Sequence, residues 1–267
     1  MLKKRVITAL WGLPILIIAV WFDEPLPWFT IFVAIWGLLA VFEFYRLVAV
    51  FEVRSLTCFG LIWTLLFVLS PHFDYDFTVP LLLTSAIVLS LVWLVLRPRK
   101  EGVFLGWVWA MAGILYVGWL LSFLVGLRLD AGRNWVFFAL FTTFGSDTIA
   151  FFIGRALGRH RLAPSISPNK TWEGAIGGVV GAIIVSLLFT LPTPLSLPLS
   201  YGQAVLLGLL VSVFGQFGDL AESLLKRNLG VKESGKMMPG HGGFLDRMDS
   251  VVFAGIVVYL YYIFVIA

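Results

Sequence analysis

The segment from Ser223 to Asp249 gathers most of the side chains in this sequence that are suited to chemistry. Its candidates are Ser223, Lys226, Arg227, Lys232, His241, Asp246, Arg247 and Asp249. Long apolar runs lie on both sides, since no residue from Gly174 to Gly218 is charged and no charge follows Asp249. Cations and carboxylates concentrated at the end of an apolar run are typical of an anion-binding site, often one with a metal. The pattern therefore predicts a phosphate-binding site.

A glycine-rich turn, Gly240-His241-Gly242-Gly243, lies in the middle of this segment. Glycine allows backbone conformations in which several N–H groups point at one phosphate. We therefore expect Gly242 and Gly243 to contact substrate. A lone histidine is a weak argument for zinc, so His241 is interpreted as a phosphate donor or as an organiser of the loop.

Four aspartates are candidates for binding a divalent cation: Asp147, Asp219, Asp246 and Asp249. Asp246 and Asp249 are three residues apart and would point to one side of a first helical turn. Together with Asp219 they suit Mg²⁺, which prefers oxygen ligands and leaves room for substrate phosphates. Asp147 lies inside an apolar span, where it is either a further ligand or a buried acid that holds helices together. We predict one Mg²⁺ ion, or two, on this set.

The residues from Arg155 to Thr171 form a strongly basic loop. Ser167 followed by Pro168 is typical of a helix start, with serine as the N-cap and proline in the first turn. Free N–H groups at such a start bind phosphate well, so Ser167 and Lys170 are predicted to contact substrate. On charge alone, an ordinary cytoplasmic loop is the alternative.

A polar helix face is expected where the apolar run before Asp219 ends. Asp219, Glu222 and Lys226 recur at helical spacing and would leave the membrane on one side of the helix. Glu222 and Lys226 are also compatible with a simple solvated salt bridge. The side chains predicted to bind phosphate groups here and nearby are Ser223, Lys226, Arg227, Lys232 and Arg247.

The composition assigns the chain to the helical membrane proteins. Its residues are 60% hydrophobic and 13% charged, with a mean hydropathy of +0.98, whereas soluble proteins are roughly 45–50% apolar and about 25% charged. The single cysteine, Cys58, excludes an internal disulfide framework and a multi-cysteine zinc site. An all-α fold is predicted, with nine spans long enough to cross a bilayer. They lie near residues 6–22, 28–46, 55–70, 78–96, 103–126, 135–154, 172–190, 201–222 and 245–265.

The distribution of basic residues predicts the orientation of these spans. With the N-terminus in the cytoplasm, seventeen lysines and arginines fall in cytoplasmic segments and two in outer ones, as the positive-inside rule requires. The formal charge of +4 therefore reflects topology and does not indicate nucleic-acid binding. We expect a scaffold over residues 1–130 and a catalytic half over residues 131–267, in one membrane domain with a cytoplasmic site. In the scaffold, Glu43 and Arg46 are interpreted as an ion pair at a helix end.

The polar motifs resemble those of the phosphatidate cytidylyltransferase family, also called CDP-diacylglycerol synthases. The C-terminal pattern of the family is matched by Ser223, Lys226-Arg227, Lys232, the residues from Pro239 to Gly243, and Asp246-Arg247-Met248-Asp249. Similar upstream motifs are Ser146-Asp147-Thr148, Gly154-Arg155, Ser167 to Gly174 and Gly215 to Asp219. The chain departs from the pattern at Glu233, where the family usually has aspartate, and at Asn169, where many relatives have lysine.

The resemblance implies transfer of CMP from CTP to phosphatidic acid, with a divalent cation and with pyrophosphate as the second product. It also implies a homodimer in a lipid bilayer, here the bacterial cytoplasmic membrane, and no nucleic-acid partner. On this interpretation the catalytic residues are Asp219, Asp246, Lys226 and Arg247. Two alternatives stay open: a CTP-dependent lipid-alcohol kinase, and a transporter of organic phosphates, whose charges should line a path to the outer face.

Overall fold

The computed structural model describes residues 2–49, 56–73, 75–96, 102–235, 237–238 and 242–267. Within these residues, six helices are long and apolar enough to cross a membrane: Trp28–Leu47, Phe77–Val95, Val103–Ala131, Arg133–Leu157, Tyr201–Asn228 and Asp249–Ile266. Three shorter apolar helices cover Leu10–Trp21, Thr57–His72 and Trp172–Leu188. Each coincides with a predicted span, so the prediction of an all-α, multi-pass membrane protein is confirmed.

The chain forms two compact units. The first comprises Met1–Leu129 and Glu233–Asp246, and the second comprises Asp130–Lys232 and Arg247–Ala267. The chain therefore changes unit near residue 130 and later returns to the first unit for one short segment. From the sequence alone, this segment, with Asp246, is expected in the second half of the chain.

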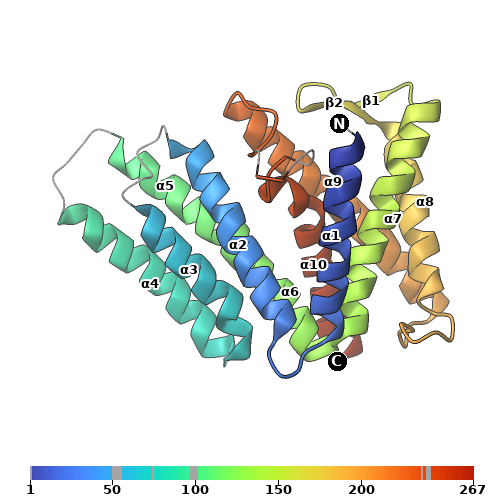
Figure 1. Ribbon diagram of the computed structural model, residues 1–267, viewed down its shortest axis with the longest axis horizontal. Coiled ribbons are helices and arrows are strands. Elements are labelled where there is room, and N and C mark those ends of the chain that lie inside the picture. Colours follow the sequence, from blue (N-terminus) through green and yellow to red (C-terminus); the bar gives the residue numbers. More distant parts are fainter. Residues whose placement is uncertain (1, 50–55, 74, 97–101, 236, 239–241) are drawn as a thin grey trace. The chain divides into compact units, whose positions relative to one another are not determined.

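The first unit consists of helices from the N-terminal part of the chain. They are α1 (Leu2–Trp21), α2 (Trp28–Leu47), α3 (Thr57–Leu69), α4 (Tyr75–Val95), α5 (Val103–Gly113) and α6 (Leu120–Gly126). A 3₁₀ turn, Ser70–His72, prolongs α3. The π-helical segments Ile114–Trp119 and Leu127–Ala131 make α5 and α6 one helical run, which is visible in Figure 1. The run continues beyond the predicted end at residue 126 because Leu127 and Leu129 extend the apolar pattern.

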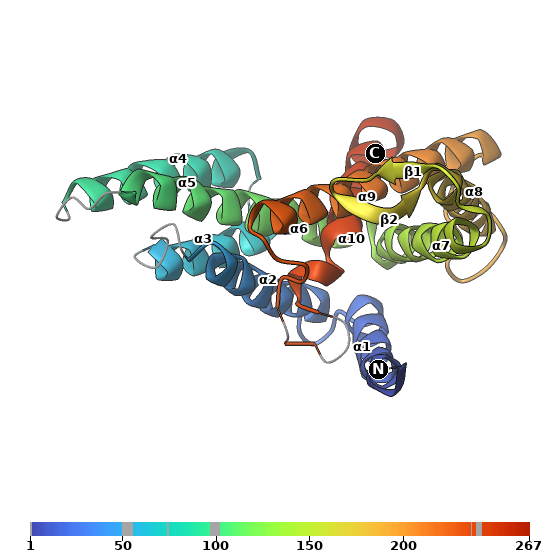
Figure 2. The same cartoon turned by 90° about the horizontal axis from the view of Figure 1, so that it is seen from above.

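Side chains from α3, α4 and α5 form a core of this unit. Phe67, Val79, Leu82, Ala86, Met111 and Ile114 are buried together, and α4 and α5 lie side by side in Figures 1 and 2. Tyr45 of α2 is also buried, and its hydroxyl donates to the carbonyl of Ala110 at 2.9 Å. A side chain at Gly60 or Gly113 would overlap the Tyr45 ring, so small residues let these helices approach one another.

The second unit consists of four helices and a short hairpin. The helices are α7 (Arg133–Leu157), α8 (Trp172–Leu188), α9 (Tyr201–Asn228) and α10 (Asp249–Tyr261). A 3₁₀ turn, Leu245–Arg247, precedes α10, and a π-helical segment, Tyr262–Ile266, follows it. Strands β1 (Arg161–Ala163) and β2 (Ser167–Thr171) pair antiparallel between α7 and α8. Figure 2 shows this hairpin at the end of α7 and α8, where β2 also contacts α9.

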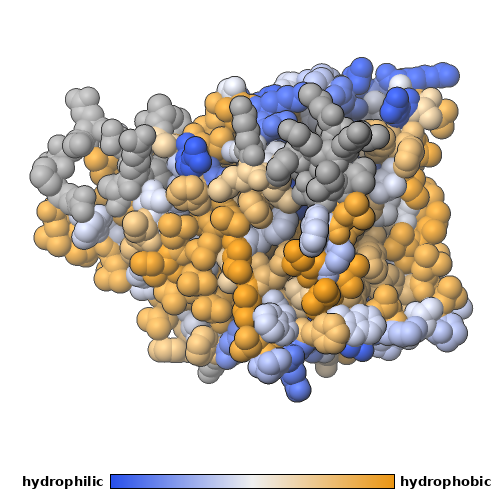
Figure 3. All heavy atoms as spheres, in the orientation of Figure 1, coloured by the Kyte–Doolittle hydropathy of each residue, from blue (hydrophilic) through white to orange (hydrophobic). Residues whose placement is uncertain are grey.

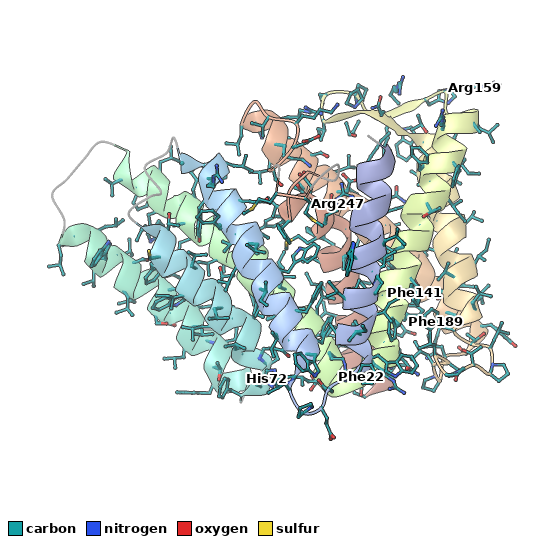
Figure 4. All side chains as sticks on the ribbon, viewed as in Figure 1. Phe22, His72, Phe141, Arg159, Phe189 and Arg247 are labelled. Carbon is teal, nitrogen blue, oxygen red and sulfur yellow. The ribbon has the colours of Figure 1, made fainter. Side chains whose placement is uncertain are left out.

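Aromatic rings pack at one end of the second unit, and the hairpin lies at the other. Phe138 and Phe141 of α7 pack against Phe189, with ring centroids 5.2 Å and 6.4 Å apart. Figure 4 places Phe141 beside Phe189 and shows Arg159 at the other end of α7, next to the hairpin. On the face seen in Figure 3, apolar side chains cover the middle of the helices and hydrophilic side chains gather at their ends. This distribution suits a bilayer.

Candidate active site

Small residues bring α8 directly onto α7 in the second unit. A Cβ atom at Gly177 would lie 2.8 Å from Ile153, and one at Gly181 would lie 2.8 Å from Ile149. Both distances are too short for an unshifted side chain, so this close packing needs glycine at these positions. The first half of α8 thus lies against the second half of α7, and Lys170, just before α8, comes within electrostatic range of Asp147.

A second close approach joins α9 to the start of α10. A Cβ atom at Gly218 would overlap the backbone carbonyl of Asp249 and lie 2.9 Å from the Phe253 ring. Because a backbone atom cannot move aside without shifting the helix, only glycine fits here. The contact holds Asp249 next to Asp219, the residue that follows Gly218.

Replacing Gly218 with alanine should therefore destabilise the protein by about 1–3 kcal/mol, the usual cost of overpacking. The thermal midpoint in detergent measures this effect. Gly202 of α9 is the matched control, because a Cβ atom there meets nothing within 4 Å. Gly202→Ala should raise stability by about 0.5–1 kcal/mol, as expected for alanine in a helix. Equal midpoints for the two variants would contradict the close approach.

Three aspartates from three helices lie near one another in the second unit. Asp147 of α7 is within electrostatic range of Asp219 of α9 and Asp249 of α10, and Asp249 is in range of Asp219. The Lys170 ammonium lies 2.6 Å from Asp219 Oδ2, with the two side chains 24% and 34% exposed. Arg247, which is exposed, is also in range of Asp147. The structure thus brings five of the predicted site residues within electrostatic range of Asp147 or Asp219.

A hydrogen-bonded chain links the helices beside this cluster. The Ser146 and Ser212 hydroxyls lie 2.7 Å apart. The Gln216 side-chain amide donates to Ser212 Oγ at 3.0 Å and to the carbonyl of Ala175 at 3.2 Å. These bonds join α7, α8 and α9 through polar atoms inside an apolar bundle, where such groups must be paired. They hold in register the helices that carry Asp147 and Asp219.

Glu222 adds a fourth carboxylate to the cluster. Its side chain is fully buried, and the Lys226 ammonium lies 3.0 Å from its Oε1. Glu222 is also within hydrogen-bonding range of Asp249. The interpretation of Glu222 and Lys226 as a solvated pair is therefore wrong, because the Glu222 carboxylate has no exposed surface. Removing Lys226 would leave a buried charge without its ion-pair partner, which is strongly unfavourable.

The other predicted residues near the end of α9 have structural contacts. The Ser223 hydroxyl donates to Asp219 Oδ1 at 3.3 Å. Arg227 Nε donates to the carbonyl of Ile166 at 3.2 Å, which fastens α9 to the hairpin. Lys232 is exposed. These contacts neither require nor exclude binding of phosphate by Ser223 and Arg227, so that role stays a prediction.

The predicted helix start at Ser167 and Pro168 is wrong. Both residues belong to β2, and α8 begins only at Trp172. Thr171 is the N-cap, because its hydroxyl accepts from the Gly174 N–H at 3.2 Å. A residue before proline favours extended backbone, and proline is tolerated on an edge strand, so the Ser-Pro pair suits a hairpin. The strand positions Lys170 for its ion pair with Asp219.

Asp246 lies in the first unit and closes a loop of its own. Its Oδ2 accepts from the Ser234 N–H at 2.9 Å, from the Ser234 hydroxyl at 2.9 Å and from the Gly243 N–H at 2.8 Å. Gly242 has a φ of 83°, which favours glycine, and its carbonyl accepts from the Met238 N–H. His241 lies outside the described residues. Gly242 and Gly243, the described part of the glycine-rich turn, thus lie against the Asp246 carboxylate.

The sequence did not indicate that Ser234 and Glu43 would contact this loop. Glu43 Oε2 accepts from the Leu245 N–H at 3.1 Å and lies 3.3 Å from the Ser234 hydroxyl, whose single proton is closer to Asp246 Oδ2. The expected ion pair of Glu43 with Arg46 is wrong, because the Arg46 guanidinium lies over the Phe42 ring, 5.9 Å from its centroid. One signal was available: Glu43 is the only acid in the apolar sequence of α2.

The donor set of the second unit fits Mg²⁺. Asp147, Asp219 and Asp249 offer carboxylate oxygens, the ligands that this ion prefers, and a cation among them would relieve their mutual repulsion. Among the described residues, no three Asp, Glu, His or Cys side chains are placed so that together they could hold a metal ion. Mg²⁺ usually uses one or two carboxylates beside water and substrate phosphates.

Comparisons with known proteins are consistent with this geometry. The model of the cytidylyltransferase family matches residues 3–265. The phosphatidate cytidylyltransferase of Bacillus subtilis is 34% identical over 98% of this chain and 97% of its own length. The phosphatidate cytidylyltransferase of Staphylococcus haemolyticus is 34% identical over 71% of this chain and 72% of its own. The phosphatidate cytidylyltransferase of Brucella abortus is 42% identical, but the match spans only 57% of this chain and 56% of that relative.

Proposed function

Because the chain belongs to the cytidylyltransferase family, we propose that it transfers CMP from CTP to phosphatidic acid. The products are CDP-diacylglycerol, a precursor for phospholipid synthesis, and pyrophosphate. The observation that carries the proposal is the group of aspartates on α7, α9 and α10 with Lys170 ion-paired to Asp219. Carboxylates and a cation side by side are the parts that phosphoryl transfer requires.

The reaction needs positioning and charge neutralisation more than proton transfer. A phosphate monoester is already anionic near neutral pH, so its oxygen can attack without a strong general base. That oxygen forms a bond to the α-phosphorus of CTP, the bond from the α-phosphorus to the bridging oxygen breaks, and pyrophosphate leaves. The protein contributes by holding both anions in line and by stabilising the charge on the leaving group.

Basic residues would hold the phosphates. Lys170, which is ion-paired to Asp219 in this structure, would exchange this partner for phosphate oxygens. Lys226 would donate to a phosphate oxygen with its remaining N–H groups while it stays paired with the buried Glu222. Arg247 is exposed and in range of Asp147, where it would contact the triphosphate. Arg227 and Lys232 would add positive charge at the entrance.

Mg²⁺ would be held by Asp219 with Asp249 or Asp147, and Asp246 stays a predicted ligand. When bound, the ion would neutralise charge on the triphosphate and on the departing pyrophosphate. With the orientation predicted from the positive-inside rule, the hairpin, the end of α9 and the start of α10 would lie in the cytoplasm, where CTP is found. We further propose a homodimer in the bacterial cytoplasmic membrane.

The position of the transferred label tests the function directly. Purified protein is incubated with Mg²⁺, phosphatidic acid and CTP labelled on either the α- or the γ-phosphate. The α-label should move into the lipid phase, and the γ-label should stay in water as pyrophosphate. If the α-label stays in water, the proposal fails. Lipid carrying the γ-label would instead indicate a lipid-alcohol kinase.

A further inference from the structure

Two described segments, Ser234–Gly235 and Gly243–Asp246, here called the loop, lie against one face of α2 within the first unit. Trp36 and Glu43 are seven residues apart, close to two helical turns, so they lie on the same side of α2. Trp36 Nε1 donates to the carbonyl of Phe244 at 3.1 Å, and the two rings meet edge to face with centroids 5.0 Å apart. Glu43 accepts from the next residue, Leu245, through its backbone N–H. The two α2 side chains therefore bind consecutive residues of the loop.

The loop is shaped around the Glu43 carboxylate. Glu43 is only 2% exposed. A Cβ atom at Gly243 would overlap Glu43 Oε2, and one at Gly235 would lie 2.5 Å from Oε1. Packing alone would be served better by an apolar side chain, since a buried carboxylate is costly. Glycine at both positions therefore leaves room for the two oxygens of the Glu43 carboxylate.

Ser234 connects Glu43 to the Asp246 carboxylate. Its hydroxyl lies 3.3 Å from Glu43 Oε2 and 2.9 Å from Asp246 Oδ2. Glu43 also holds the N–H of Leu245, the residue before Asp246. Movement of the Glu43 side chain would thus shift both Leu245, the residue before Asp246, and Ser234, the hydrogen-bond donor to Asp246.

From these contacts we infer that Glu43 is a positioning residue: it fixes the loop so that the Asp246 carboxylate keeps one orientation. The inference rests on the proposed function in so far as Asp246 takes part in catalysis. Residues that orient a functional carboxylate from behind typically contribute about 10- to 100-fold to activity.

Hydrogen exchange tests the loop contact without any reference to activity. In Glu43→Ala, the amide hydrogen of Leu245 loses its acceptor, so its exchange should become at least about tenfold faster, as local opening becomes easier. Thr30→Val is the matched control, because Thr30 is a buried polar residue of α2 that pairs with His72. The control should leave Leu245 exchange unchanged. Equal protection of Leu245 in wild type and Glu43→Ala would overturn the inference.

Kinetics test the positioning role. Per folded enzyme, Glu43→Ala should lower kcat by about 10- to 100-fold with little change in the KM for phosphatidic acid. Glu43→Gln can still accept from Leu245 and should recover part of that loss. If Glu43→Ala does not fold, the kcat of Glu43→Gln is compared with that of the wild-type protein instead. A residue with a purely structural role would change the yield of folded protein and leave kcat per folded enzyme at the wild-type value, which would also overturn the inference.

A glycine variant adds an independent test. Gly235→Ala alone should speed the exchange of Leu245, because the added methyl group displaces the Glu43 carboxylate. In the Glu43→Ala background the same change should have no further effect. If wild-type protein shows no CMP transfer, the proposed function fails, whereas the exchange results on Glu43 and Gly235 still decide the loop contact.

Discussion

Replacing Asp219 with asparagine is expected to lower kcat for CMP transfer by about 100- to 1000-fold, the scale of losing one preorganised electrostatic contact. Asp219 pairs with Lys170 at 2.6 Å and lies in electrostatic range of Asp147 and Asp249. Asparagine has the same size and can still accept from the Ser223 hydroxyl, so the fold should persist. The negative charge that would hold Mg²⁺ and orient Lys170 is lost. Transfer of α-label from CTP at saturating substrate measures kcat, and the thermal midpoint confirms folding.

Asp130 offers a matched control for this variant. It belongs to the same unit but precedes α7, at the end opposite Arg159, and its carboxylate accepts from the Tyr259 hydroxyl. Asp130→Asn makes the same chemical change away from the aspartate cluster and should keep near-normal turnover. If Asp219→Asn were as active as Asp130→Asn, the assignment of Asp219 to the metal and phosphate site would be wrong.

Asp246→Asn is expected to lower kcat by about 100-fold while the loop keeps its shape. An asparagine oxygen in the position of Oδ2 can still accept from the Ser234 and Gly243 N–H groups, but the charge is gone. The exchange rate of the Gly243 amide should therefore stay at its wild-type value. In this respect Asp246→Asn should differ from Glu43→Ala, which frees the loop.

The control for Asp246→Asn comes from the same unit. Asp23 is 39% exposed and pairs with Arg128 at 3.4 Å, an arrangement that contributes little to stability. Asp23→Asn should be nearly silent in turnover. Near-normal activity of Asp246→Asn in the same assay would remove Asp246 from the site and, with it, the functional reason for the Glu43 inference.

The membrane spans could be predicted because they depend on local composition. The uncharged run after Glu173 contains most of the helix Trp172–Leu188, a connecting turn, and most of the helix Tyr201–Asn228. Length and hydropathy alone are enough for such elements. Asp147, Asp219 and Asp249 could also be singled out from the sequence, since a carboxylate within or beside an apolar run has few bland explanations. The structure brings the three within electrostatic range of one another, and their role in metal binding stays a prediction.

The hairpin and the loop on α2 could not be predicted, because their partners are distant in sequence. Pro168 is compatible with a helix start and with an edge strand, and only the pairing of β2 with β1 decides between them. Glu43 has Arg46 one turn away, which suggested a local ion pair, whereas its actual partners come from the segment after residue 233. Sequence spacing predicts which residues are neighbours along one helix. It does not predict which unit a later segment of the chain packs against.

The return of the chain to its first unit also affects biosynthesis. Ser234 follows Glu43 by 191 positions, so the ribosome has made most of the protein before the partners of this acid exist. During insertion, α2 enters the membrane with a carboxylate near its end whose partners in the loop have not yet been translated. The contacts of Glu43 with Ser234 and Leu245 therefore form only near the end of translation.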